Sequence, residues 1–362
     1  MWFRQIARAS RARPDPFVLS LLGVLLLATF APCHGTSAAV CHALGIVAIA
    51  TLFFLQGARL SRAAILNGIT CWRLHAAVAT TTFVLFPLTG LALSVAFPTT
   101  LPPLLWTGVL FLCALPSTVQ SSIALTSMAN GNVAGAICSA TASNVAGIAL
   151  TPLIFGALSR VHGGGVSLDG AGQVFCELLV PFLAGHWLRP WIGGWVESHR
   201  RVLSFTDRGS ILLVVYGAFS AAVVHGVWHQ LPPTVLLLLT LIVAFVLAIG
   251  LVSINLASVT LGFGKQDTIA AMFCGSQKSL VSGVPMASAL FSAAAMGPVL
   301  IPIMIYYPMQ LVVCAWLARR YAIAPDATLA VRPDRESLAA AGVVPGRIDI
   351  SHARQPAVLP GR

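Results

Sequence analysis

Charged residues are scarce in this chain of 362 residues, since Asp, Glu, Lys and Arg together make up only 9% of it. Soluble globular domains contain about 25% charged residues. Hydrophobic residues reach 57%, and apolar runs of roughly 20 residues, the length that spans a hydrocarbon core, recur along nearly the whole chain. A secreted protein with a cleaved signal peptide has one such run at its start, so that class is excluded. The sequence predicts a polytopic membrane protein.

Acidic residues are few as well: there are ten of them against 21 Lys and Arg, and the formal net charge is +11. A basic excess can indicate nucleic-acid binding, but here its placement indicates membrane orientation. Basic residues gather in the N-terminal arm (1–15) and in alternate connections, whereas the opposite connections, such as CHGTS, FPTTLPP and HQLPP, hold none apart from Arg160. The positive-inside rule then predicts a multi-pass protein of the inner (plasma) membrane with both termini cytoplasmic and no nucleic-acid partner. Outside the arm, the residues concerned are Arg59, Arg62, Arg73, Arg189, Arg200, Arg201, Arg208, Lys265, Arg319 and Arg320.

Motifs for metal centres and for catalysis are missing too. The eight cysteines stand singly, without a CxxC pair, so the sequence indicates neither a zinc site nor a disulfide framework. It contains no HExxH, no GxSxG and no pair of intramembrane carboxylates, so neither an enzyme nor a resident cofactor is expected. His75, His186 and His225 each lie near the end of an apolar run, where we interpret them as interfacial histidines.

Apolar segments are abundant in the chain, and the polar stretches that separate them predict ten spans. We expect an all-α membrane protein with two halves of five spans, at 16–158 and 173–318, joined by a loop at 159–172. Residues 319–362 are expected to form a weakly ordered cytoplasmic tail, because they are rich in Arg, Asp, Ala and Pro. The predicted spans are 16–32, 38–58, 74–97, 103–128, 132–158, 173–193, 208–228, 234–262, 267–291 and 297–318.

Two halves with five crossings each must be inverted relative to one another if they are related. VQSSIA at 119–124 resembles SQKSLV at 276–281, with Gln120 matching Gln277 at an offset of 157 residues. The same offset carries the start of the first span onto the start of the sixth. We therefore predict an inverted repeat.

The fourth and ninth spans are each interrupted in the middle by small polar residues, PSTVQSS at 116–122 and CGSQKS at 274–279. Polar backbone at membrane depth persists only where protein buries it or a wet cavity adjoins it. Two interrupted spans at matching repeat positions indicate a transporter's binding site. The alternative is that Pro116 merely kinks one helix and that the serines bond to their own carbonyls. The candidate site residues here are Gln120, Ser121, Ser122, Ser276, Gln277 and Ser279.

SATASN at 139–144, in the fifth span, adds three polar candidates. Ser143 and Asn144 follow Ser139 by four and five residues, which places all three on nearly one helical face. They either line the same cavity or belong to a surface for close helix packing, since the surrounding AGAICSATASNVAGIA is rich in small residues.

Lys278, one of only two lysines in the chain, lies in the middle of the ninth span. A lysine at the centre of a membrane helix costs about 2.5–3.5 kcal/mol on insertion scales, so such residues usually face the bundle interior and mark a pathway. Its ammonium would attract an anionic solute or lose its proton on desolvation. A structural ion pair with Glu177, near the start of the sixth span, is the alternative.

Four stretches together resemble the bile acid:sodium symporter superfamily, and within it the bacterial SBF-like branch related to the divergent seventh member of solute carrier family 10. They are LFFLQGARLS in the second span, PSTVQSS, GNVAGAICSATASNVAGIALTP in the fifth, and FCGSQKSLVSGVPMA in the ninth. The resemblance covers about residues 10–320. It implies ten helices in two inverted five-helix repeats with a panel and a core domain, and broken fourth and ninth helices that cross near the site.

The resemblance also implies sodium sites in the sodium-coupled branch, and this chain departs from their pattern. Two serines at 121–122 stand where the fourth helix of that branch has Ser-Asn, and Thr82 stands where the third helix supplies a glutamine. In the ninth-helix pattern Glu-Val-Gly-Met-Gln-Asn, Phe273 replaces the glutamate, Gln277 keeps the glutamine and Lys278 replaces the asparagine. We therefore expect Lys278 to take the electrostatic role of a sodium ion, so that transport is sodium-independent or coupled through lysine protonation.

The leading interpretation is a secondary transporter that moves an organic, anionic or amphipathic solute by alternating access. A metalloid or ion permease of a related ten-helix fold is an alternative, because Cys113 lies three residues before Pro116, near the place where such permeases carry a cysteine. A non-transporting membrane regulator or sensor is another, although the tail contains no recognisable output domain. The expected partners are a small-molecule solute and the lipid bilayer, and the sequence predicts neither the identity of the solute nor the oligomeric state.

Overall fold

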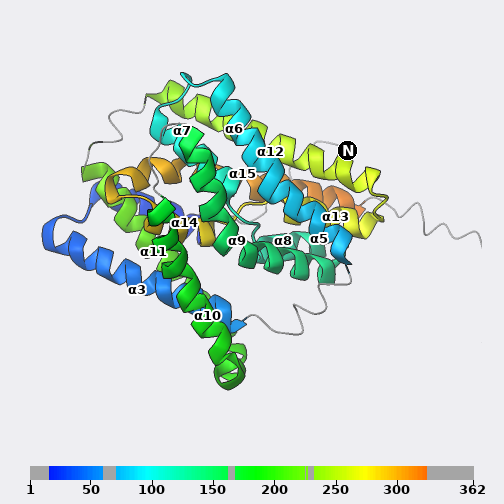
Figure 1. Ribbon diagram of the computed structural model, residues 1–362, viewed down its shortest axis with the longest axis horizontal. Helices are drawn as coiled ribbons and strands as arrows, with labels where there is room; N and C mark the ends of the chain where they lie inside the picture. Colours follow the sequence, from blue (N-terminus) through cyan, green and yellow to red (C-terminus); the bar gives the residue numbers. More distant parts are fainter. Residues whose placement is uncertain (1–15, 60–70, 162–167, 225, 227–231, 324–362) are drawn as a thin grey trace, which may run out of the picture. The chain divides into compact units, whose positions relative to one another are not determined.

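The regular secondary structure of the described chain is entirely helical, which confirms the all-α class. In the computed structural model the described residues are 16–59, 71–161, 168–224, 226 and 232–323, and no strand occurs among them (Figure 1). The predictions for the N-terminal arm, for Arg62 and His225, and for the tail beyond residue 323 lie outside this part. The chain divides into two units, Met1–Ala322 and Ile323–Arg362, and the helices and the site lie in the first.

Each predicted span corresponds to one helix or to one interrupted helix. Six stretches are long and apolar enough to cross a membrane: Gly35–Arg59, Trp72–Ala96, Val133–Ser159, Val202–Val224, Pro233–Thr260 and Ala295–Ala322. Two shorter apolar helices are Leu19–Phe30 and Pro103–Ala114. The helices are α2 (Pro16–Phe30), α3 (Gly35–Arg59), α5 (Trp72–Thr80), the π-helical turn η2 (Thr81–Leu85), α6 (Phe86–Ala96), α7 (Pro103–Ala114), α8 (Gln120–Met128), α9 (Val133–Val161), α10 (Leu168–Ser198), α11 (Arg200–Val224), α12 (Pro233–Thr260), α13 (Lys265–Ser276), α14 (Leu280–Leu290) and α15 (Ala293–Ile323).

Several helices extend past the predicted spans. The sixth span was predicted to end at residue 193 and the seventh to begin at 208, whereas α10 continues to Ser198 and α11 begins at Arg200. Hydropathy marks only the apolar part of a helix, while backbone hydrogen bonding continues into polar residues that favour helices, arginine among them. Arg200 and Arg201 therefore lie within α11 rather than in a connection.

The fourth span is interrupted at residues 115–119, called here the first break. Leu115 precedes a proline, which disfavours the helical conformation, and it is extended with φ −68° and ψ 150°. α7 therefore ends at Ala114, and α8 starts at Gln120. The predicted interruption at 116–122 is thus too long, because Ser121 and Ser122 already belong to the first turn of α8.

The ninth span is interrupted at residues 277–279, called here the second break. Gln277 is extended with φ −85° and ψ 145°. Ser279, with φ −83° and ψ 110°, caps the next helix, because its Oγ accepts a hydrogen bond from the Ser282 N–H. The chain therefore leaves the helix for three residues and resumes it as α14.

The helices pack into two groups. The first helix group consists of α2, α3, α10 and α11, in which α3 packs against α10 and α11, and α2 packs against α11. The second helix group contains α5 to α9, α12 and α13. Helix α15 contacts both groups, because Tyr307 packs against Phe17 of α2 and Val299 lies beside Gly108 of α7. The two groups meet where α10 packs against α9 and where α14 packs against α10 and α11 (Figure 1).

Within the first helix group, α3 and α10 cross at two glycines. A Cβ atom on Gly57 would lie 1.9 Å from the Phe182 carbonyl oxygen, and one on Gly185 would lie 1.9 Å from the Phe54 carbonyl oxygen. Only glycine fits at either position, since the two backbones touch directly. This crossing holds the end of α3, with Gln56 and Arg59, at a fixed place beside α10.

Candidate functional site

The two breaks meet inside the protein. The Ser279 N–H donates to the Pro116 carbonyl oxygen at 2.9 Å. Ser117, Thr118, Gln277 and Lys278 are all buried. Protein thus encloses the non-helical backbone of both breaks, as a hydrocarbon environment demands.

Lys278 is completely buried, and its ammonium is enclosed by main-chain oxygens. Nζ donates to the carbonyl oxygens of Leu115 at 2.8 Å, Cys113 at 2.9 Å and Thr82 at 3.0 Å. An ammonium has three N–H donors, so these bonds use all of them. The Phe86 ring lies on another side, with its centroid 4.2 Å from Nζ, and adds a cation–π contact. We call these three carbonyls and this ring the ammonium cage.

Two carbonyls of the cage come from the end of a helix. Cys113 lies in the last turn of α7, and Leu115 follows its last residue. The last four carbonyls of a helix have no partner within it and carry the negative end of the helix dipole. The break after Ala114 therefore creates the site that the ammonium fills.

The third carbonyl of the cage is freed by the π-helical turn. Thr82 O would accept the Phe86 N–H in an α-helix, but the Phe86 N–H donates to Thr81 O instead. The next residue, Pro87, has no N–H to offer. Thr82 O is thus available to Lys278, and π-helical turns are often found at functional sites for this kind of reason.

Helix α15 completes the second break. Gln310 accepts the Lys278 N–H at 2.7 Å and donates to the Lys278 carbonyl oxygen at 2.9 Å. The Tyr306 hydroxyl donates to the Ser276 carbonyl oxygen at 2.6 Å. Neither residue is among the site residues predicted from the sequence, although a glutamine within the apolar run YYPMQLVV is a signal for such a role.

Hydroxyls from the fourth span hold the glutamine of the second break. Gln277 Oε1 accepts hydrogen bonds from Ser121 Oγ at 2.6 Å, from Ser122 Oγ at 3.1 Å and from Thr118 Oγ1. Ser122 Oγ also lies 3.1 Å from the Phe273 carbonyl oxygen. The Gln277 amide nitrogen is buried and has no hydrogen-bond partner within the described chain. Polar residues of the two interrupted stretches therefore contact one another directly, although Gln277 does not contact Gln120, its match in the repeat.

The other predicted site residues divide into those at the breaks and those away from them. Ser143 Oγ accepts the Ser117 N–H at 3.1 Å, which ties α9 to the first break. Ser276 Oγ donates back to the Met272 carbonyl oxygen at 2.7 Å, as a serine within a helix often does. Ser139 instead contacts His75 Nδ1 at 2.7 Å, and Gln120 is exposed at the start of α8.

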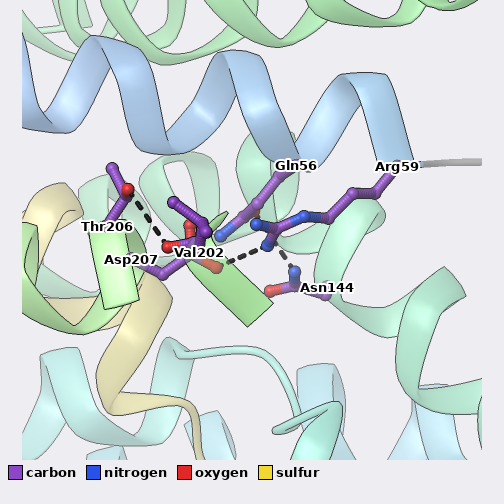
Figure 2. Close-up of polar contacts among 6 residues, drawn as sticks. All are labelled: Gln56, Arg59, Asn144, Val202, Thr206 and Asp207. Atoms are coloured by element: carbon purple, nitrogen blue, oxygen red, sulfur yellow. Dashed lines mark hydrogen bonds and ion pairs between the residues drawn. The ribbon is translucent and has the colours of Figure 1, made fainter. Parts of the chain in front are cut away.

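Asn144 connects the breaks to the first helix group. Its Oδ1 accepts from Ser282 Oγ at 2.6 Å, and its Nδ2 donates to Gln56 Oε1 at 3.4 Å. Arg59, three residues after Gln56 on α3, forms an ion pair with Asp207 of α11 (Figure 2). Gln56 and Asp207 are not among the site residues predicted from the sequence, since partners so far apart in the chain cannot be paired from one sequence.

Two helices that are interrupted and meet inside a helical membrane protein define a class, the membrane transporters with broken helices. The chain belongs to the SBF-like CPA transporter family, whose model matches residues 15–323. This confirms the resemblance drawn from the motifs. It also makes the protein a membrane transporter and not an enzyme.

Three relatives show how far the similarity extends. The chain is 52% identical over 329 residues to the uncharacterized protein PA2026 of Pseudomonas aeruginosa, covering 90% of this chain and 99% of the relative. It is 49% identical over 307 residues to "Putative symporter YfeH" of Escherichia coli, covering 85% and 92%. Sodium/bile acid cotransporter 7 of Mus musculus is 26% identical over 311 residues, covering 83% and 90%. These matches run through most of both chains in each pair.

Proposed function

We propose that the protein is a secondary transporter that moves an organic anion or an amphipathic solute by alternating access. Its ten spans form two inverted five-helix repeats, 16–158 and 173–318, in the inner membrane with both termini cytoplasmic. The helix bounds, the two breaks at matching positions and the placement of basic residues support this arrangement. The first helix group is then the panel, and the second is the core that moves against it.

The ammonium cage supports the proposal that transport does not depend on sodium. When it is protonated, Lys278 brings one positive charge to the place where the breaks meet. Phe273, which stands where the sodium-coupled branch has a glutamate, is fully buried in an apolar cluster with Leu125 and Ile269. A sodium ion here would find a cation beside it and no carboxylate at that position. We therefore infer that the tethered ammonium takes the electrostatic role of sodium.

Protonation of Lys278 is linked to the geometry of the cage. The ammonium supplies one N–H to each of three carbonyls, whereas a neutral amine has only two N–H groups. Loss of the proton leaves one buried carbonyl without a donor, at a cost of about 1–3 kcal/mol. A proton gained or lost during transport therefore acts directly on the contact between the two breaks.

The test is a thermal-shift screen of the purified full chain with organic anions, followed by flux of the stabilising compounds into proteoliposomes. Each is measured in sodium chloride and in choline chloride, and at two pH values. We expect the same shift and the same flux in both salts. Strict sodium dependence contradicts the role given to Lys278, and binding without flux favours a sensor over a transporter.

The position of the Cys113 thiol argues against a metalloid permease. The Cys113 thiol packs beside Gly90, where an added Cβ would lie 2.9 Å from Sγ. It is fully buried, and only its main-chain oxygen takes part in the cage. A thiol in this position is a packing group, so we expect no arsenite resistance from expression of the protein.

A further inference from the structure

Two cysteines lie together where the chain passes from α2 to α3. Cys33 is in the connection that follows α2, and Cys41 is in the second turn of α3. Their thiols are in hydrogen-bonding contact with each other, and both are partly exposed. Cys41 follows Cys33 by eight residues, so no CxxC motif marks the two positions in the sequence. We call these two residues the hairpin pair.

Hydrogen bonds hold the connection that carries Cys33. The Tyr216 hydroxyl of α11 donates to the Ala31 carbonyl oxygen at 2.8 Å. Ser37 Oγ accepts the His34 N–H at 3.1 Å and donates to the His34 carbonyl oxygen at 2.8 Å. The backbone is therefore fixed on both sides of Cys33.

Cys41 lies against the same part of α11. A Cβ atom on Gly217 would lie 3.3 Å from Cys41 Sγ, so the glycine leaves room for the sulfur. Gly217 directly follows Tyr216 in the sequence. Both α2 and α3 pack against α11. One stretch of α11 thus positions both members of the hairpin pair.

The surroundings of the hairpin pair favour a disulfide bond over a metal site. Exposed histidines follow both cysteines, but the described residues contain no group of three or more His, Cys, Asp or Glu side chains that could hold a metal ion. The CHGTS connection has no Lys or Arg, so the positive-inside rule predicts that it lies outside the inner membrane, where disulfides form and persist. Cys41 is three residues inside the predicted span 38–58, about 4.5 Å of helix, and is therefore near the membrane surface.

We propose that Cys33 and Cys41 form a disulfide bond in the cell, an inference that rests on the proposed orientation of the protein in the inner membrane. The two thiols lose two protons and two electrons as the sulfur–sulfur bond forms. The oxidant is a protein disulfide of the outer compartment. One thiolate attacks it to give a mixed disulfide, and the second thiolate displaces the oxidant, which leaves as a dithiol with both electrons and both protons. The bond closes the segment 33–41 and ties the connection to α3.

The chain contains a matched pair of cysteines on the opposite side of the predicted spans. Cys71 precedes α5, Cys138 lies on α9, and their thiols are near each other and partly exposed. Arg73 follows Cys71 by two residues, and connections with basic residues are predicted to be cytoplasmic. The cytosol keeps thiols reduced. We call Cys71 and Cys138 the control pair and expect it to stay reduced.

The test reads the oxidation state of each cysteine in the full chain from native membranes. The sample is quenched with acid, denatured and treated with N-ethylmaleimide, which blocks free thiols. Reduction then exposes the oxidised cysteines to iodoacetamide, and mass spectrometry identifies the label at each position. We expect iodoacetamide on Cys33 and Cys41, and N-ethylmaleimide on Cys71 and Cys138. In Cys33→Ser, Cys41 should carry N-ethylmaleimide, whereas Cys71→Ser should leave the hairpin pair oxidised.

A melting experiment measures the structural effect of the bond. A reductant should lower the apparent melting temperature of the purified parent protein, because a cross-link restricts the unfolded chain. The double variant Cys33→Ser with Cys41→Ser should melt at the same temperature with and without the reductant. An equal response of the two proteins contradicts the structural role given to the bond.

Failure of the disulfide and failure of the orientation give different results. In Cys33→Ser, a membrane-impermeant maleimide labels Cys41 in spheroplasts if the connection lies outside. Such labelling, together with a reduced hairpin pair in the parent, overturns the disulfide and keeps the orientation. Labelling only in inverted membrane vesicles overturns the orientation and the disulfide with it. Equal oxidation of the hairpin pair and the control pair also overturns the inference, because it indicates oxidation after the cells were broken.

Discussion

The two breaks solve the same problem with different chemistry. The first break leaves carbonyls at the end of α7, and a cation from the second break, Lys278, satisfies them. The second break leaves carbonyls at the end of α13, and neutral hydroxyls of Ser122 and Tyr306 contact them. One helix end is thus neutralised by a charge and the other by dipoles.

The difference teaches that neither break is complete alone. The fourth span supplies the hydroxyls that surround Gln277, and the ninth span supplies the ammonium that the fourth span lacks. Each break supplies buried hydrogen-bond partners to the other, and α9 and α15 supply further ones. We therefore expect a substitution in one break to destabilise both. The loss in the free energy of unfolding should increase with the number of polar groups left without a partner.

Lys278→Met gives the largest expected effect, because it removes the ammonium that caps the helix end at the first break. Three buried carbonyls lose their donor, at about 1–3 kcal/mol each, so the free energy of unfolding should fall by at least about 3 kcal/mol. The measurement is the apparent melting temperature of the purified protein. Lys265→Met, at the exposed start of α13, is the matched control and should change little. A Lys278→Met protein as stable as the parent would show that water replaces the ammonium in the cage.

Gln310→Leu ranks second and tests the backbone of the second break. It leaves both the N–H and the carbonyl of Lys278 without a partner while the ammonium stays in place. The expected loss in the free energy of unfolding is about 2–3 kcal/mol, measured by the same melting experiment. Gln266→Leu, an exposed glutamine in the first turn of α13, serves as the control. Equal stability of the two variants would mean that α15 does not support the break.

The sequence predicts the positions of the helices and the breaks well, because their causes are local. Apolar runs mark the spans, and Pro116 and the stretch around Lys278 mark the interruptions. The cage is not local. Thr82 was selected for its side chain, in place of a glutamine, yet its main-chain carbonyl meets the ammonium because the turn widens before Pro87.

Two other residues show that the contacts of a polar residue cannot be predicted from its residue type and position in the sequence alone. Gln120 matches Gln277 in the repeat, but it is exposed, since the first break ends early enough for α8 to start at that residue. Arg59 counts toward the predicted orientation of the spans, but its ion pair with Asp207, 148 residues away in the chain, is not predicted by the sequence. Contacts between distant helices depend on packing, which a single sequence does not specify.

Tyr306→Phe should have the smallest effect, and it tests the second break, where neutral hydroxyls contact the helix end. It removes one hydroxyl from the Ser276 carbonyl oxygen, so we expect a loss of about 1 kcal/mol in the free energy of unfolding. Tyr216→Phe is the matched control, because its hydroxyl also bonds a carbonyl, that of Ala31, but at an exposed position where water can replace it. If Tyr306→Phe costs as much as Lys278→Met, the two breaks depend on each other so strongly that loss of either cap separates them. A loss near that of Tyr216→Phe means instead that the neutral break tolerates a missing partner and that the charged cap alone holds the pair.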